Sequence, residues 1–239
     1  MLSGALAYIQ ALNYLPKKWM LKNILLSGTL SLILFAGLVA LIYYQGDDLS
    51  ELILSWFSIK EQDGILNIGI DWLSRILLWV LALFSFKYLI LIVAGPFVGD
   101  VSEKVKQASE LGRKLSYMKT GLVSSSYRGI QLALKNAFKE ILITIVLLVI
   151  GLVTGLIAIT GPLIIVLQAY YLGFANLDIV FEKHLSARDA RTLIKKNKGM
   201  AIMNGLGFLA ILLIPFLGIF IAPAYSMAAA TKSGTRLLV

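Results

Sequence analysis

The chain contains 239 residues, of which 59% are hydrophobic and only 15% are charged, and it has no cysteine. A soluble domain of this size usually carries about 25% charged residues, so the composition excludes an ordinary soluble enzyme and predicts one integral membrane domain, residues 1–239. Without cysteine there can be no disulfide or thiolate metal site, and one histidine, His184, cannot form a histidine cluster or a Ser-His-Asp triad. We therefore expect no enzymatic activity, no metal and no cofactor.

The first apolar segment, residues 24–44, predicts a transmembrane helix. It has 21 residues without a charge, which is about 30 Å of helix and matches a bilayer core. Lys17, Lys18 and Lys22 stand just before it and follow Pro16. A helix start that follows proline and carries lysines offers free N–H groups and positive charge to an oxyanion. The alternative is a basic anchor that touches anionic lipid.

The next two segments predict an outer loop and a second span. Turn-forming residues at 45–48 are expected to end the first helix, and residues 45–72 contain six acids against one base. Residues 76–99 then predict a second transmembrane helix with a single charge, Lys87. A charge at that depth is costly. We therefore expect Lys87 to form a structural ion pair, with Asp178 as one candidate partner. The alternatives are that Lys87 binds substrate in the pathway or snorkels to the membrane surface.

Two longer apolar runs are broken by proline and glycine. The first, within residues 141–181, has 37 consecutive uncharged residues, too many for one crossing, and Gly161-Pro162 predicts its break. The second, residues 200–231, is interrupted at Pro215 and again at Pro223, and its pieces of 15 and 13 residues are too short for about 30 Å of hydrocarbon. We predict two broken, partially inserted helical hairpins, of which the first could also cross completely.

The distribution of positive charge predicts the orientation. Residues 100–140 contain eight Lys or Arg against four acids, and residues 182–199 contain six against two. Because positive residues mark the cytoplasmic side, we expect both of these connectors and both termini inside, and the acidic loop outside.

Both connectors are expected to contain amphipathic helices. Apolar residues spaced three and four apart from Val101 to Met118 predict one helix, and Gly121–Ser126 predicts the turn after it. Ser186 with Asp189 resembles a capping box that opens a second helix. The interleaved apolar residues favour a lipid surface over nucleic acid.

Several short motifs follow one another along the chain: Gly95-Pro96-Phe97-Val98-Gly99 with Glu103 four residues on, Arg128, Tyr170-Tyr171, Asp178-Ile179-Val180-Phe181, Arg191 with Asn197, and the closing elements Gly207-Phe208, Ile214-Pro215, Ala222-Pro223 and Ala229-Ala230-Thr231. Their order and spacing, from about Tyr8 to Thr231, resemble the CysZ sulfate permeases and the related etoposide-induced-protein-like membrane proteins. The resemblance implies two long transmembrane helices, two partially inserted hairpins, and an oligomer whose subunits enclose a sulfate pathway.

The chain departs from that family pattern at two places. Leu15-Pro16-Lys17-Lys18-Trp19 stands where the family has a Gly-Leu-Arg motif implicated in sulfate binding, so lysine replaces arginine there. Ala133 stands where a glutamate usually follows the arginine at position 128. The resemblance nevertheless makes Pro16, Lys17, Lys18 and Lys22 the candidate residues for binding the substrate.

Charged residues at the ends of the hairpins predict an ion-pair cluster. We expect this cluster to hold the hairpins in place rather than to line a pore, and it consists of Glu103, Arg128, Asp178 and Arg191. The complete prediction is an all-α integral membrane protein of the bacterial inner membrane. It has two long transmembrane helices, two broken hairpins and cytoplasmic amphipathic helices. We expect a homo-oligomeric anion permease or channel for sulfate, and the alternative is a non-transporting membrane scaffold or membrane-shaping protein.

Overall fold

The computed structural model describes residues 2–56, 89, 95, 97–115, 122–214 and 216–239, and these ranges contain helices and no strand. The helices in chain order are α1 (Leu2–Ala11), the 3-10 helix η1 (Leu12–Tyr14), α2 (Lys18–Trp56), the helical residues 97–107, α4 (Glu110–Arg113), α5 (Leu122–Thr154), α6 (Ile157–Phe181), α7 (Ala187–Lys196), α8 (Lys198–Leu212) and α9 (Leu217–Thr235).

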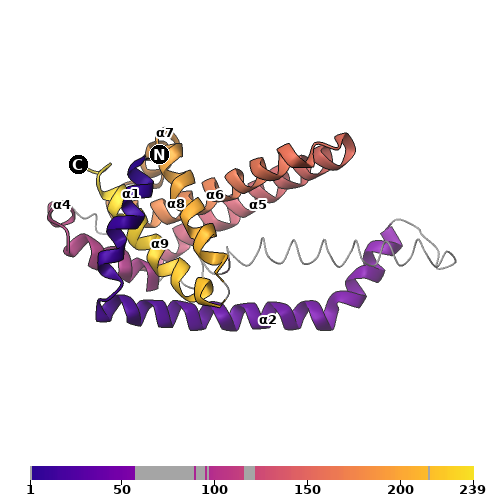
Figure 1. The fold of residues 1–239 in the computed structure, drawn as a ribbon, viewed down its shortest axis with the longest axis horizontal. Coiled ribbons are helices and arrows are strands. Elements are labelled where there is room, and N and C mark those ends of the chain that lie inside the picture. Colours follow the sequence, from indigo (N-terminus) through magenta and orange to yellow (C-terminus); the bar gives the residue numbers. More distant parts are fainter. Residues whose placement is uncertain (1, 57–88, 90–94, 96, 116–121, 215) are drawn as a thin grey trace.

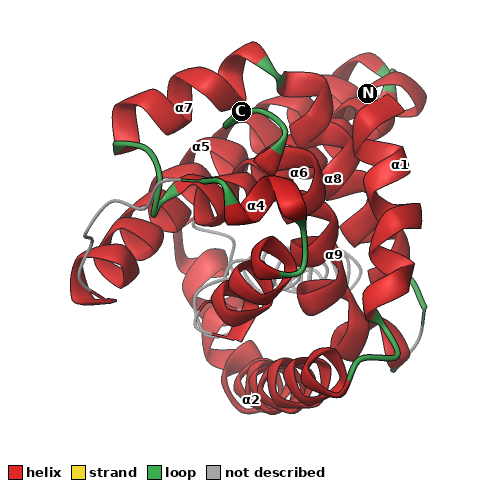
Figure 2. Ribbon diagram, turned by 90° about the vertical axis from the view of Figure 1, so that its left-hand side faces the viewer, coloured by secondary structure: helices red, strands yellow, loops and turns green. Residues whose placement is uncertain are grey.

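Helices α1, α6, α8 and α9 pack together as a bundle, and the antiparallel pair α5–α6 projects away from it (Figure 1). The long helix α2 runs along the bundle against α9, and Figure 2 shows it nearly end-on beneath the other helices. Both termini lie on the same side of the bundle.

Two of the described helices are long and apolar enough to cross a membrane. They are α2 over Lys18–Leu41 and α6 over its whole length. The predicted span 24–44 therefore falls within α2. Most of the predicted span 76–99 lies outside the described residues, as do Lys87 and residues 57–72 of the predicted outer loop.

Helix α5 buries three polar residues and exposes many apolar ones, although Lys135 and Lys139 near its start are also exposed. Glu140 is 0% exposed, and Asn136 and Thr144 are buried one turn away on either side. By contrast Phe138 is 65% exposed and Leu134 is also exposed. A helix facing water has the opposite pattern. The exposed apolar residues continue from Leu142 to Val166, so the outer surface of the α5–α6 pair around its turn fits surroundings of hydrocarbon.

The closest helix crossing in the bundle joins α6 to α8. A Cβ atom built on Gly173 would overlap the carbonyl oxygen of Ala201, and one built on Gly205 would overlap the carbonyl oxygen of Ala169. Both obstacles are backbone atoms and cannot rotate away. Glycine at these two positions therefore sets the distance between the two helices.

The first hairpin turns at Gly155, and the predicted break at Gly161-Pro162 is wrong. Gly155 has a φ of +70°, the left-handed conformation that commonly ends a helix and that glycine adopts without strain. Pro162 instead lies inside α6. Proline removes one backbone hydrogen bond. Near the start of α6 the carbonyl that loses this bond lies at the exposed end of the hairpin.

The second hairpin turns between α8 and α9, where Pro215-Phe216-Leu217-Gly218 predicts a break, and this break is confirmed. Phe216 has a φ of +60° at the turn. The second predicted break, at Pro223, is wrong because α9 continues through it. Pro223 and the residues after it are buried among α1, α2 and α8, and this packing outweighs the single hydrogen bond that proline removes.

Two predicted turns are also helical. The residues at 45–48 lie inside α2, which continues to Trp56, because the apolar residues Leu49, Leu52, Ile53 and Trp56 keep a helical spacing. Residues 122–126 belong to α5 rather than to a turn. The predicted helix Val101–Met118 ends earlier, at 107, and Ser109 then caps the separate helix α4.

Candidate functional site

The predicted helix start before the first span lies at the beginning of α2. The N–H groups of Met20 and Leu21 donate to the carbonyl oxygen of Lys17 at 2.8 and 3.0 Å, so Lys17 is the residue that caps the helix. Pro16 and Lys17 are both exposed, as are Lys18 and Lys22. The first turn of α2 therefore carries three exposed lysines at the positive end of the helix dipole.

Two lysines from elsewhere in the chain join this helix start. The Nζ atoms of Lys17 and Lys232 lie 5.0 and 5.6 Å from the centre of the Tyr14 ring. The Nζ atom of Lys104 lies 6.0 Å from the centre of the Trp19 ring, and the two rings are 5.9 Å apart. The aromatic pair thus brings together cations from the residue that caps α2, from the helical residues 97–107 and from α9. We call Lys17, Lys18, Lys22, Lys104 and Lys232 the basic patch.

One acid partly balances the basic patch. The Asp100 carboxylate accepts hydrogen bonds from Lys104 at 2.7 Å and from Asn23 at 2.9 Å. Burial alone would raise the pKa of Asp100, but these hydrogen bonds and the charges of Lys104 and Lys22 outweigh it and lower the pKa. Asp100 therefore stays ionised, and the patch of five lysines keeps a net positive charge.

Arg128 and Asp178 tie the two ends of the first hairpin together. The Nη2 and Nε atoms of Arg128 donate to the two carboxylate oxygens of Asp178 at 2.7 and 3.3 Å, and Nη1 donates to the carbonyl oxygen of Leu185 at 2.9 Å. The side chain of Asp178 is only 4% exposed. This two-pronged pair connects the start of α5 to the end of α6 and is the centre of the cluster expected from the sequence.

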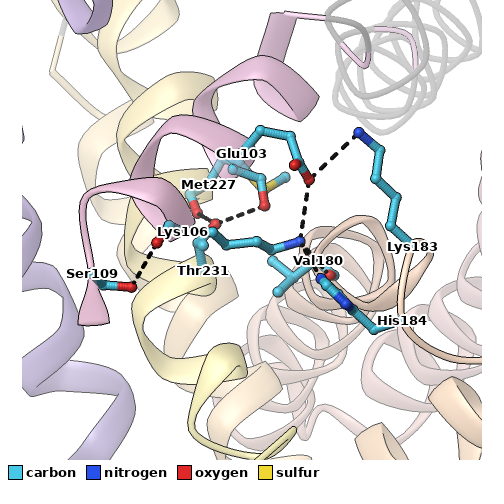
Figure 3. A network of polar contacts seen from close by, with 9 residues as sticks. Glu103, Lys106, Ser109, Val180, Lys183, His184, Met227 and Thr231 are labelled. Atoms are coloured by element: carbon cyan, nitrogen blue, oxygen red, sulfur yellow. Dashed lines mark hydrogen bonds and ion pairs between the residues drawn. The ribbon is translucent and has the colours of Figure 1, made fainter. Parts of the chain in front are cut away.

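Glu103 pairs with other partners (Figure 3). Its carboxylate lies 3.4 Å from the Nζ atom of Lys106 and 3.5 Å from that of Lys183. Lys106 is 1% exposed, donates to the carbonyl oxygen of Val180 at 3.0 Å, and lies 3.0 Å from Nε2 of His184. The structure therefore places Glu103 in a second network, which meets the Arg128–Asp178 pair at the end of α6.

The fourth residue of the predicted cluster, Arg191, lies on α7 and is partly exposed. In the described ranges no ion pair includes it. Lys106 and His184 were not among the predicted site residues. Only the tertiary structure could reveal their contact, because they are 78 positions apart in sequence.

Replacing Lys106 by methionine is expected to change how stability depends on pH. Burial lowers the pKa of Lys106 from its ordinary 10.5, against the opposing effect of Glu103. The folded protein therefore holds this proton less tightly than the unfolded chain. The wild-type free energy of unfolding should consequently rise as pH increases from the folded pKa toward 10.5.

Lys106→Met has no such proton and should lack this part of the slope. Thermal unfolding of the detergent-solubilised protein at a series of alkaline pH values measures the difference. Lys195→Met, at an exposed position on α7, should keep the wild-type slope. Equal slopes in wild type and Lys106→Met would contradict the expectation.

A buried polar contact joins α6, α8 and α9. The amide nitrogen of Asn176 donates to the amide oxygen of Asn204 at 2.9 Å, and the amide nitrogen of Asn204 donates to the carbonyl oxygen of Ser226 at 3.0 Å. Such hydrogen bonds hold apolar helices together where the hydrophobic effect is weak. These contacts link the two hairpins to each other through α6, α8 and α9.

The fold and these contacts define a class: a helical protein with two helices able to span a membrane and with hairpins held by buried polar pairs. The family model described as sulfate transporter CysZ/etoposide-induced protein 2.4 matches residues 7–223, and the chain belongs to that family. This confirms the resemblance recognised in the sequence motifs. Comparison with curated proteins gives no match. The family description names a transporter of sulfate and not an enzyme.

Proposed function

We propose that the chain is a permease or channel that carries sulfate across the bacterial inner membrane. The observation that supports this most directly is the basic patch at the first turn of α2. Free N–H groups and the positive end of a helix favour an oxyanion, and lysines add point charges. The family description agrees with an oxyanion as the substrate.

The proposed pathway runs between subunits of a homo-oligomer and is bounded by the hairpins. Helix α8 has 15 residues, or about 22 Å at 1.5 Å per residue, which is shorter than the roughly 30 Å of a bilayer core. The α8–α9 hairpin is therefore proposed to enter the membrane only partway. We propose that both termini and the basic connectors face the cytoplasm, as their positive charge favours.

Neutralising the two lysines at the helix start, Lys17→Ala/Lys18→Ala, is expected to reduce sulfate uptake into proteoliposomes about tenfold or more at subsaturating sulfate. One charge-assisted hydrogen bond contributes about 1.5–3 kcal/mol, and about 1.4 kcal/mol corresponds to a factor of ten. The matched control is Lys195→Ala/Lys196→Ala, which removes two exposed lysines from the far end of α7. This control should keep sulfate uptake within about twofold of wild type, a change in free energy well below the roughly 1.4 kcal/mol that corresponds to a factor of ten.

The outcomes of this experiment separate the parts of the proposal. Unchanged uptake in the Lys17/Lys18 variant would place the binding site elsewhere. No uptake by folded wild-type protein, at either sign of an imposed membrane potential, would exclude sulfate as the substrate. The potential matters because each charge that crosses 100 mV gains or loses about 2.3 kcal/mol.

The rival function is a membrane scaffold that reshapes lipid without transport. It would need an amphipathic helix free to lie in the membrane surface. Helix α7 has the required basic residues, but Ala190 and Ile194 on its apolar side are fully buried against the rest of the protein. This packing counts against the scaffold. Reshaping of liposomes by a protein that passes no solute would favour it.

A further inference from the structure

A cavity of about 410 Å³ lies between the helical residues 97–107 with α4 and the last turns of α9. A water molecule occupies about 30 Å³ of liquid, so the cavity has room for a tetrahedral oxyanion with part of its hydration. The described lining residues include two cations and three hydroxyl groups and no acid: Val105, Ala108, Ser109, Leu111, Thr231, Lys232, Thr235 and Arg236.

Of the three hydroxyl groups, only that of Thr235 lacks a partner within the described ranges. Ser109 accepts from the N–H group of Gly112 and donates to the carbonyl oxygen of Lys106, both at 3.0 Å. The hydroxyl of Thr231 makes hydrogen bonds at 2.8 and 3.1 Å. Thr235 is 3% exposed and its Oγ1 atom makes none. Burying a hydroxyl without a partner is unfavourable, and a bound acceptor would remove that cost.

The two cations that line the cavity keep N–H donors unused by the hydrogen bonds of the described residues. Arg236 uses one nitrogen, Nη2, to donate to Gln10 at 3.0 Å, out of the five N–H donors of a guanidinium. Lys232 rests on the Tyr14 ring, a contact that uses no N–H of the ammonium in a hydrogen bond. Both residues also lie at the carboxyl end of α9, where cations offset the helix dipole. That role explains their charge, but it explains neither the cavity nor the unpartnered hydroxyl of Thr235.

We propose that this cavity binds a tetrahedral oxyanion, a sulfate or phosphate group, through Lys232, Arg236 and the hydroxyl of Thr235. The anion is either free in solution or the headgroup of an anionic lipid, because both present the same oxygens. The site shares Lys232 with the basic patch, but Lys17 and Lys18 do not line it, and binding there does not depend on transport.

The absence of native cysteine permits a direct test of occupancy. Ala108 lines the cavity and is exposed, so Ala108→Cys introduces a single thiol there. In delipidated full-length protein at constant ionic strength, sodium sulfate is expected to slow the reaction of this thiol with a maleimide about tenfold relative to sodium chloride. The tenfold change corresponds to about 1.4 kcal/mol of protection. A second arm replaces sulfate by phosphatidylglycerol.

Variants in the Ala108→Cys background identify the ligating groups. Lys232→Gln/Arg236→Gln should abolish protection, and Thr235→Val should weaken it. The control is Thr192→Cys, at an exposed position on α7. Its thiol should react with the maleimide at the same rate in chloride, in sulfate and with phosphatidylglycerol. Protection by sulfate supports a site for the free anion, and protection by phosphatidylglycerol alone supports a site for the lipid headgroup.

Two results would overturn the proposal: protection by neither compound, or protection that survives Lys232→Gln/Arg236→Gln. Uptake assays on the same preparations keep this outcome distinct from the proposed function. Uptake that depends on Lys17 and Lys18 without protection at position 108 would remove the cavity site alone. Protection without any uptake would remove the transport function alone.

Discussion

Arg128→Met is expected to destabilise the protein by about 3–5 kcal/mol, because it leaves the Asp178 carboxylate buried without its cation. The side chain of Asp178 is 4% exposed, and among the described residues Arg128 is its only ion-pair partner. The substitution also removes the hydrogen bond to the carbonyl oxygen of Leu185. The start of α5 would then be released from the end of α6. Unfolding of the purified protein in mixed micelles measures the loss.

Arg191→Met is the matched control for this prediction. Arg191 carries the same charge near the same end of the hairpin but forms no ion pair within the described ranges, so its loss should change stability by no more than about 0.5 kcal/mol. Arg128→Met/Asp178→Asn removes both charges and should recover part of the lost stability, since no uncompensated charge stays buried. Equal effects of Arg128→Met and Arg191→Met would show that the pair contributes nothing.

Gly205→Val is expected to destabilise the protein at least as much as Arg128→Met, because the valine side chain would collide with the carbonyl of Ala169 on α6. Overpacking in a well-packed core costs about 1–3 kcal/mol where neighbours can rotate away. Here the obstacle is backbone, so α6 and α8 must move apart. Their separation would also break the Asn176–Asn204 hydrogen bond that lies between them. We expect the variant to lose most of its folded yield.

Gly37→Val tests whether the destabilisation comes from the close crossing of α6 and α8 or from replacing a helical glycine by valine in general. Gly37 lies in α2, is exposed, and a Cβ there meets nothing within 4 Å. The variant should therefore fold as well as wild type, measured by size-exclusion profile and melting temperature. Normal yield and stability of Gly205→Val would mean that α6 and α8 do not cross as closely as described.

Local chemistry along the chain predicted much of the helix organisation. The helix start after Pro16, the capping of α7 by Ser186 and the turn before Leu217 all follow from short-range signals, and the structure contains them. The breaks assigned to Pro162 and Pro223 failed because proline removes one hydrogen bond, and packing of the surrounding helix exceeds that loss. Gly155, the actual turn, has a weaker signal in sequence because glycine is also common inside apolar helices.

The amino-acid sequence by itself determined the class of protein, since apolar runs, charge asymmetry and motif order are properties of the linear chain. Only the tertiary structure decided which distant side chains meet. Lys104 and Lys232 reach the start of α2, and Arg128 reaches Asp178 across 50 positions, only because the helices pack as they do. Side-chain contacts depend on helix crossings that are set by glycine and alanine positions, as at Gly173 and Gly205. The basic patch, the two ionic networks and the cavity beside α9 are therefore properties of the fold.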